Sequence, residues 1–426
     1  MTVFVFIASL LAAMALGMPL AFSLIVSGVA LMLHLDNFDT QIVSQNLING
    51  ADNFPLMAVP FFMLAGELMN AGGMSRRIVN SALVWVGHFK GGLGYVAVFA
   101  AIIMASLSGS AVADTAALAA VLMPMMREAG YRMDRSAGLI AAGGIIAPVI
   151  PPSIGFILFG VIGGVSISKL FMAGIFPGIL MGVALLITWW IVARKDDVKV
   201  SASVPMKEKV RVTIDAFWCY LLALTIIGGM KMGIFTPTEA AVVAVVYSLL
   251  IGLFVYREIK FKDLYGIILA AAKTSSVVMF LVAAALVSAW LITIANIPAQ
   301  VVDMLRPFID NPTLLMVMLM LMVLIVGTAL DFAHTVLILT PVLMPLVREA
   351  GINPVYFGVL FIINNAIGLL TPPVGTVLNV VCGVGRIPMH EVIRGVMPFL
   401  ISQVIVMGLL VAFPILVMGP LKWLSS

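Results

Sequence analysis

The chain has 426 residues, of which 63% are hydrophobic and only 10% charged, and its mean hydropathy is +1.20. Soluble proteins carry about a quarter charged residues, so this composition excludes a soluble globular protein and indicates a chain whose apolar surface faces lipid. The net charge of +4 does not indicate nucleic-acid binding, because the basic residues lie in short loops between apolar stretches.

The N-terminal half contains a series of apolar segments long enough to cross a lipid bilayer. They cover 3–33 (interrupted near Gly17), 54–69, 93–126, 136–163 and 170–192. Residues 75–90 mix basic and apolar side chains and predict an amphipathic helix at the membrane interface. Two of the segments contain breaks: SGSAVADT at Ser108–Thr115 and IPPSIG at Ile150–Gly155.

The C-terminal half continues the pattern after a long polar loop at 194–211. Its apolar segments cover 216–230, 239–256, 264–297, 313–347, 354–383 and 392–416. Two of these are also broken, by GTALDFAHT at Gly327–Thr335 and by TPPVGT at Thr371–Thr376. The fold class predicted is therefore an all-α polytopic membrane protein.

The broken segments belong to an internal repeat. VLMPMMREAG at 121–130 recurs as VLMPLVREAG at 342–351, so that Val121 aligns with Val342. When this alignment is extended without gaps, 15 of the 60 positions in 121–180 are identical to their counterparts in 342–401, and Pro151-Pro152 falls on Pro372-Pro373. Each copy thus has one break before the duplicated motif and one after it.

Charge and span parity predict that the two copies face opposite sides of the membrane. The basic loops 194–211 and 257–263 should be cytoplasmic, and they are separated by two spans. The flanks of segment 93–126 carry several basic residues and should also be cytoplasmic, whereas the basic residues that flank segment 313–347 are offset by acidic ones. The residues concerned are Lys90, Arg127, Arg132 and Arg135 in the first case, and Arg306, Arg348, Asp310 and Glu349 in the second. If 93–126 and 313–347 are re-entrant hairpins, five spans separate them, which gives an inverted repeat.

Breaks within apolar spans indicate a transport site. Irregular backbone at membrane depth is tolerated only where it is buried in protein or lines a wet cavity. Carbonyls freed at such breaks, together with helix C-termini, can hold a cation such as Na⁺, and helix N-termini can face an anion. Four breaks meeting near a pseudo-twofold axis would form the ion and substrate site of a secondary transporter.

The candidate sodium- and substrate-binding residues are those of the four breaks. They are Ser106, Ser108, Gly109, Ser110, Asp114, Pro151, Pro152 and Ser153 in the first repeat, and Gly327, Thr328, Asp331, Thr335, Thr371, Pro372, Pro373, Gly375, Thr376 and Asn379 in the second. Other interpretations stay open. The serines could bond only within their hairpin, Asp114 could be an N-cap, and Asp331 could lie at a wet tip rather than as a buried intramembrane charge.

The sequence offers no sign of an enzyme or of ATP-driven transport. It contains neither a phosphate-binding G-x-x-x-x-G-K-[ST] loop nor an HExxH or GxSxG motif. No cofactor is expected apart from Na⁺ as coupling ion, so an ion gradient or a partner chain must drive transport. A channel is a further alternative, but broken helices in an inverted repeat favour alternating access.

The sequence motifs at the breaks resemble those of one protein family. SLSGSAVADTAALAAVLMP, IPPSI, KLFMAGIFPG and LTPVLMPLVREAG with TPPVGTVLNV are similar to the large membrane subunit of tripartite ATP-independent periplasmic (TRAP) transporters, and the resemblance covers essentially the whole chain. It implies a Na⁺-driven uptake system of the bacterial inner membrane. It also implies an organic-acid substrate delivered by a periplasmic binding protein, and a small four-helix membrane subunit, here a separate polypeptide.

The resemblance further implies an elevator mechanism and a division of the chain into four parts. These are scaffold helices with an interfacial arm (1–92), a first transport unit (93–193), a loop with further scaffold helices (194–312) and a second transport unit (313–426). Among the organic acids, the motifs favour a sugar acid such as sialic acid or diketogulonate as the substrate, rather than a C4-dicarboxylate. The alternative is a stand-alone Na⁺-coupled dicarboxylate or citrate symporter of related fold.

Overall fold

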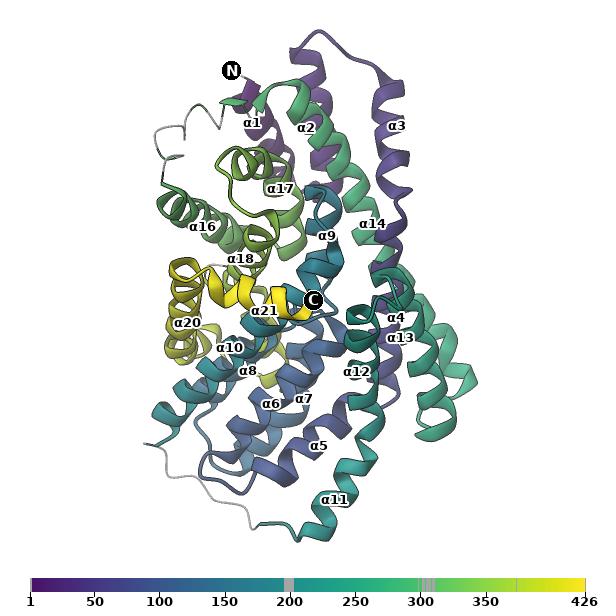
Figure 1. Cartoon of the computed structure of the whole chain (residues 1–426), viewed down its shortest axis with the longest axis vertical. Helices are drawn as coiled ribbons and strands as arrows, with labels where there is room; N and C mark the ends of the chain where they lie inside the picture. The colour runs from purple at the N-terminus through teal and green to yellow at the C-terminus, as the bar shows by residue number, and fades with distance from the viewer. Residues whose placement is uncertain are drawn as a thin grey trace.

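A computed structural model describes residues 2–194, 203–297, 299–300, 303, 308, 311–372 and 374–425. The regular structure of these residues is helical. Figure 1 shows an elongated bundle with α1, α2 and α3 at one end and α11 at the other. Some residues used in the sequence-based predictions lie outside the described residues: 195–202 of the basic loop 194–211, Arg306, Asp310 and Pro373.

The N-terminal part of the chain differs from the sequence-based prediction. The segment predicted at 3–33 is not one interrupted span but two helices, α1 (Thr2–Ala15) and α2 (Leu20–His34), which pack against each other. The chain turns between them because Gly17 adopts a left-handed conformation (φ +79°) and Pro19 precedes α2. The polar stretch that follows contains a helix the sequence analysis missed, α3 (Thr40–Ala51), whose N-cap Asp39 accepts a hydrogen bond of 2.7 Å from the Gln41 N–H.

Three elements complete this part of the chain: a 3₁₀ turn η1 (Phe54–Met57), α4 (Ala58–Ala71) and α5 (Met74–Val86). The last of these confirms a helix in the segment predicted to be amphipathic. The middle of the chain holds α11 (Met206–Asp215), α12 (Phe217–Lys231), α13 (Pro237–Leu250) with a π turn η2 (Ile251–Val255), a 3₁₀ turn η3 (Phe261–Asp263) and α14 (Leu264–Ile294).

The two repeats fold into matching sets of helices. The first contains α6 (Gly92–Ser108), α7 (Ala111–Glu128), α8 (Met133–Gly144), α9 (Ile154–Gly163) and α10 (Ile167–Ala193). The second contains α16 (Pro312–Ala329), α17 (Phe332–Glu349), α18 (Pro354–Gly368), α19 (Thr376–Gly385) and α20 (Met389–Ala412), followed by the unpredicted α21 (Ile415–Ser425). Helix α17 begins and ends at the positions that the repeat alignment pairs with the first and last residues of α7, so the sequence repeat is also a repeat of secondary structure.

The breaks divide apolar segments into short helices. Six described helices are long and apolar enough to cross a membrane, or seven if α11 and α12, bent by 51°, form one span. By contrast, α9 and α19 have 10 residues each. Ten residues of helix cover about 15 Å, half of a hydrocarbon core that is roughly 30 Å thick. The chain is therefore a multi-pass membrane protein, and α9 and α19 are each too short to cross the hydrocarbon core alone.

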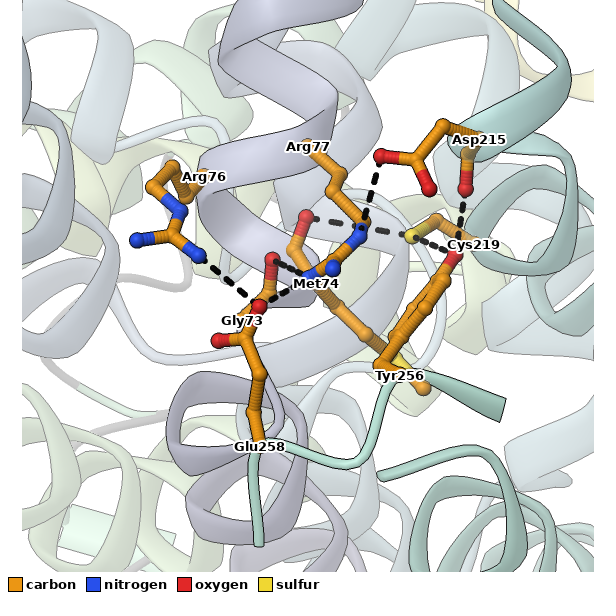
Figure 2. A network of polar contacts seen from close by, with 8 residues as sticks. All are labelled: Gly73, Met74, Arg76, Arg77, Asp215, Cys219, Tyr256 and Glu258. Carbon is orange, nitrogen blue, oxygen red and sulfur yellow. Dashed lines mark hydrogen bonds and ion pairs between the residues drawn. The ribbon is translucent and has the colours of Figure 1, made fainter. Parts of the chain in front are cut away.

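A network of charged residues near α11 joins three parts of the chain (Figure 2). The Arg77 guanidinium of α5 lies 2.6 Å from a Glu258 carboxylate oxygen, 3.1 Å from Asp215 at the end of α11, and over the Tyr256 ring at 3.7 Å. The Tyr256 hydroxyl in turn donates a hydrogen bond of 2.6 Å to the Asp215 carbonyl. These contacts fix the amphipathic helix α5 to α11 and to the chain that follows α13.

Helices α8 and α20 cross at a pair of glycines. A Cβ atom on Gly138 would lie 2.6 Å from the Gly395 carbonyl carbon, and one on Gly395 would overlap the backbone of Asp134. This crossing brings the helix after the first hairpin against the last long helix of the second repeat. The two repeats are thus packed together backbone to backbone.

Replacing Gly395 with alanine should therefore destabilise the protein by about 1–3 kcal/mol, the usual cost of overpacking. The matched control is Gly408→Ala on the same helix, where nothing lies within 4 Å of the added Cβ. Thermal unfolding of the purified protein in detergent measures both variants. An equal melting temperature for the two would show that the α8–α20 crossing can widen at no cost.

Candidate ion and substrate site

The tip of the first hairpin is a two-residue turn. Helix α6 ends at Ser108, Gly109 takes a left-handed conformation (φ +64°), and Ser110 caps α7 by accepting a hydrogen bond of 3.4 Å from the Ala113 N–H. Asp114 lies one turn further along and is not the N-cap, so that interpretation of Asp114 is wrong. The tip leaves Asp114 free for another role.

Asp114 is a buried carboxylate of which one oxygen accepts a hydrogen bond from a described residue and the other does not. The Ser108 hydroxyl donates to Asp114 Oδ1 and accepts a hydrogen bond of 3.2 Å from the Ser110 N–H. Asp114 is only 2% exposed, and its Oδ2 has no partner among the described residues. A buried polar atom without a partner costs about 1–3 kcal/mol, and more when charged, so a ligand that bound this oxygen would offset that cost. By contrast, the Ser106 hydroxyl donates within α6, to the Ile103 carbonyl at 2.6 Å.

The first break lies beneath this tip. Ser153 caps α9 by accepting a hydrogen bond of 3.1 Å from the Phe156 N–H, and its hydroxyl donates to the Pro148 carbonyl. A Cβ on Gly109 would overlap the carbonyl oxygen of Pro152 and lie 3.3 Å from the Ser153 Cα. The first tip and the first break, including Pro151-Pro152, therefore form one closely packed unit.

The tip of the second hairpin is built differently. Asp331 stands at the N-cap of α17 but makes no capping bond with its side chain, and its carboxylate lies 3.8 Å from His334 Nδ1. The Asp331 side chain is 46% exposed, unlike that of Asp114. Thr335 is buried and donates to the Asp331 carbonyl at 3.2 Å, whereas Thr328 donates to the Ile325 carbonyl of its own helix. The wet-tip interpretation of Asp331 agrees with this exposure.

The second break starts α19 without a side-chain cap. Gly375 is left-handed (φ +48°) and precedes Thr376, whose buried hydroxyl has no partner among the described residues. The Asn379 amide donates to the Val374 carbonyl at 2.9 Å, and the Thr371 hydroxyl to Ile367 at 2.8 Å. These bonds stabilise the non-helical turn that contains Pro372.

Contacts across the repeats bring three of these features together. A Cβ on Gly155, at the start of α9, would lie 2.6 Å from the Phe332 ring at the second tip. The Asn365 amide of α18 donates to the Phe332 carbonyl at 2.8 Å. Gly327 of α16 packs against Gly368, where an added Cβ would lie 2.8 Å from the Gly327 carbonyl. The first tip, the first break and the second tip are thus continuous, and α18 links them to the second break.

Two further residues with buried oxygens in this region are not among the site residues predicted from the sequence. Thr115 Oγ1 and Asn365 Oδ1 are buried and have no partner among the described residues. Asn365 is the counterpart of Gly144 in the repeat alignment, and Gly144 packs directly against Thr115. The signal that could have found Asn365 is this alignment, which replaces a glycine by an amide within an apolar helix.

Four residues of the tips, the breaks and the helices beside them carry oxygens of the kind that hard cations take as ligands. These oxygens, buried and without a partner among the described residues, come from a carboxylate, an amide and two hydroxyls: Asp114, Asn365, Thr115 and Thr376. Oxygen ligands of this kind suit hard cations, and breaks in membrane helices supply further carbonyls. The N-termini of α9 and α19 both begin at the breaks, where their free N–H groups favour negative charge.

Residues 7–416 match the family described as "Tripartite ATP-independent periplasmic transporter, DctM component". The chain belongs to this family. The permease is 55% identical over 425 residues to the 2,3-diketo-L-gulonate TRAP transporter large permease protein of Escherichia coli (strain K12), with 100% of each chain covered. It is 38% identical to the sialic acid TRAP transporter large permease protein of Vibrio cholerae, covering 93% of each chain. The C4-dicarboxylate TRAP transporter large permease protein of Pseudomonas aeruginosa is 33% identical, covering 95% of this chain and 94% of that one.

The fold also matches a solved structure, that of the Alcanivorax borkumensis YdaH transporter. The TM-score is 0.66 over 92% of the permease and 91% of that chain, at 14% sequence identity. At this identity the match supports the helical fold alone. Together, the comparisons establish a TRAP large permease, a class that works with a small membrane subunit and a periplasmic binding protein.

Proposed function

We propose that this permease imports an organic acid by Na⁺ symport, with Na⁺ held at the four breaks. The observation that carries the proposal is the set of buried, unpartnered oxygens on Asp114, Thr115, Asn365 and Thr376. Because an ionised carboxylate is expensive to bury alone, a bound cation would offset that cost at Asp114. The carbonyls near Pro152 and Phe332 would complete the coordination, and the N-termini of α9 and α19 would attract the substrate's carboxylate.

The proposed substrate is a sugar acid of the diketogulonate type. The name of the relative that is 55% identical over its full length points to this class, ahead of the sialic acid and C4-dicarboxylate relatives at 38% and 33% identity. The partners proposed are a separate small four-helix membrane subunit and a periplasmic binding protein, in the bacterial inner membrane.

The proposed movement is that of an elevator with inverted repeats. The parts 93–193 and 313–426, which hold both hairpins and both broken helices, would move as one transport unit against the scaffold parts 1–92 and 194–312. The close crossing of α8 and α20 at Gly138 and Gly395 supports motion of the two repeats as one body. Re-entrant hairpins from opposite sides would let the bound acid face each side in turn.

The proposal is tested by uptake into proteoliposomes. The permease, its small subunit and the binding protein are reconstituted with radiolabelled 2,3-diketogulonate, with and without an inward Na⁺ gradient. We expect uptake only with all three proteins and the gradient, because the ion supplies the driving force and the binding protein delivers the acid. Uptake by the permease alone would instead support a stand-alone symporter, and uptake driven equally by K⁺ would contradict Na⁺ coupling.

A further inference from the structure

The duplicated motif carries an arginine that makes the same bond in both repeats. Arg127 at the end of α7 donates to the Gly385 carbonyl at 2.7 Å, and Arg348 at the end of α17 donates to the Gly163 carbonyl at 2.7 Å. The two arginines are counterparts in the repeat alignment, and each acceptor is the last residue of the short helix of the other repeat, α19 or α9. Each arginine therefore stabilises the C-terminus of a half-helix across the repeat boundary, where cations are favourable.

Arg348 also lines a cleft of about 540 Å³, whereas Arg127 does not line this cleft. One wall comes from α3 and α14, in the proposed scaffold, and the other from the end of α9 and from α17, in the proposed transport unit. The wall formed by α3 and α14 is tightly packed, because a Cβ on Gly50 would lie 2.9 Å from the Ala283 Cα. Helices α3, α9 and α17 lie in the half of the molecule away from α11 (Figure 1).

The residues that line the cleft suit a ligand that is an anion and carries hydroxyl groups. Arg348 is the only charged residue among the described residues that line it, and it forms no ion pair within the described part of the chain. A guanidinium has five N–H donors, and the bond to Gly163 uses one of them. Asn46 and Asn49 of α3 and Trp290 of α14 also line the cleft. The Asn46 amide group donates a hydrogen bond of 2.9 Å to the Ile42 carbonyl of its own helix, which leaves its Oδ1 as the acceptor that it can offer to a ligand.

We infer that this cleft is a receiving site, in which Arg348 binds the carboxylate of the acid and the α3 asparagines bind its hydroxyl groups before it reaches the breaks. The inference rests on the proposed function, because only an organic-acid importer has such a cargo. The volume falls within the range of about 300–1,000 Å³ that is usual for small-molecule sites. The cleft opens between the proposed scaffold and the proposed transport unit, so the acid would enter it before the transport unit moves.

The repeat supplies the matched control for the test. Arg348→Gln and Arg127→Gln each remove one bond to a half-helix carbonyl, but only Arg348→Gln removes the charge from the cleft. Uptake of diketogulonate is measured in the three-protein proteoliposomes as a function of loaded binding protein. We expect Arg348→Gln to raise the KM about tenfold, the effect of losing one charged hydrogen bond, and Arg348→Lys to restore part of it. Arg127→Gln should leave the KM unchanged, although its kcat can fall as far as that of Arg348→Gln.

A second variant, on the opposite wall of the cleft, tests the inference even if Arg348→Gln impairs folding. Asn49 is exposed and lies on the scaffold wall of the cleft, so Asn49→Ala should raise the KM severalfold with kcat unchanged. Equal KM values for Arg348→Gln, Arg127→Gln and wild type, or an unchanged KM for Asn49→Ala, would overturn the receiving site while leaving the proposed function intact. If the wild-type complex takes up no acid at all, the proposed function fails, and the inference fails with it.

Discussion

Replacing Asp114 with asparagine is expected to lower Na⁺-driven uptake about 100-fold. The substitution keeps the size of the side chain and an acceptor for the Ser108 hydroxyl, but it removes the charge from a residue that is 2% exposed. Losing a charged contact of about 2.7 kcal/mol corresponds to a factor of about 100. Because Asp114 Oδ2 has no partner among the described residues, the proposed cation would be the partner that asparagine loses.

Binding of Na⁺ can be measured apart from transport. A ligand that binds only the folded state raises its stability with concentration, so the melting temperature of the wild-type permease should rise as NaCl replaces choline chloride. The rise should be absent in Asp114→Asn and intact in Asp263→Asn, an exposed acid that accepts a hydrogen bond of 3.1 Å from the Lys260 N–H. A Na⁺-dependent rise that persists in Asp114→Asn would remove this carboxylate from the ion site.

The sequence was sufficient to predict the periodic features of the fold. The helical class, the repeat that aligns Val121 with Val342, and the helix ends at the first tip and at Gly375 all follow from local rules, because clustered glycine and serine, or paired prolines, disfavour a continuous helix. The errors are also local. The turn at Gly17 was taken for an interruption of one span, and α3 was missed because its sequence is polar.

The chemistry of the tips could not be predicted because it depends on contacts between distant segments. Asp114 and Asp331 are both acids near a hairpin tip, but the first is buried against its own repeat while the second is 46% exposed. Whether Ser106 or Thr115 keeps a free oxygen depends on which neighbours fill the space around it. The hydrogen bond from the Asn365 amide to the Phe332 carbonyl likewise depends on how α18 packs against the second tip.

The second large effect is expected for Gly109→Ala, at the point where the first tip packs on the first break. Two costs combine there. Alanine resists the left-handed conformation at φ +64°, and its Cβ would overlap the Pro152 carbonyl oxygen. The first cost is about 1–2 kcal/mol and the second about 1–3 kcal/mol. To relieve the overlap, the tip must lift from the break, which separates Ser108 and Asp114 from the carbonyls near Pro152.

Gly130→Ala separates these two costs. Gly130 is also left-handed (φ +80°) and lies in the same repeat, but nothing is within 4 Å of its added Cβ. Both variants should lose similar stability, because each places alanine in a left-handed backbone conformation. Only Gly109→Ala should also raise the Na⁺ concentration needed for half-maximal uptake. An overlap that costs about 1–3 kcal/mol corresponds to an increase of about tenfold or more. The measurement is uptake against external Na⁺ at constant ionic strength. If the two variants showed the same Na⁺ dependence, close contact between tip and break would not be needed for ion binding, and coordination would have to come from within the hairpin alone.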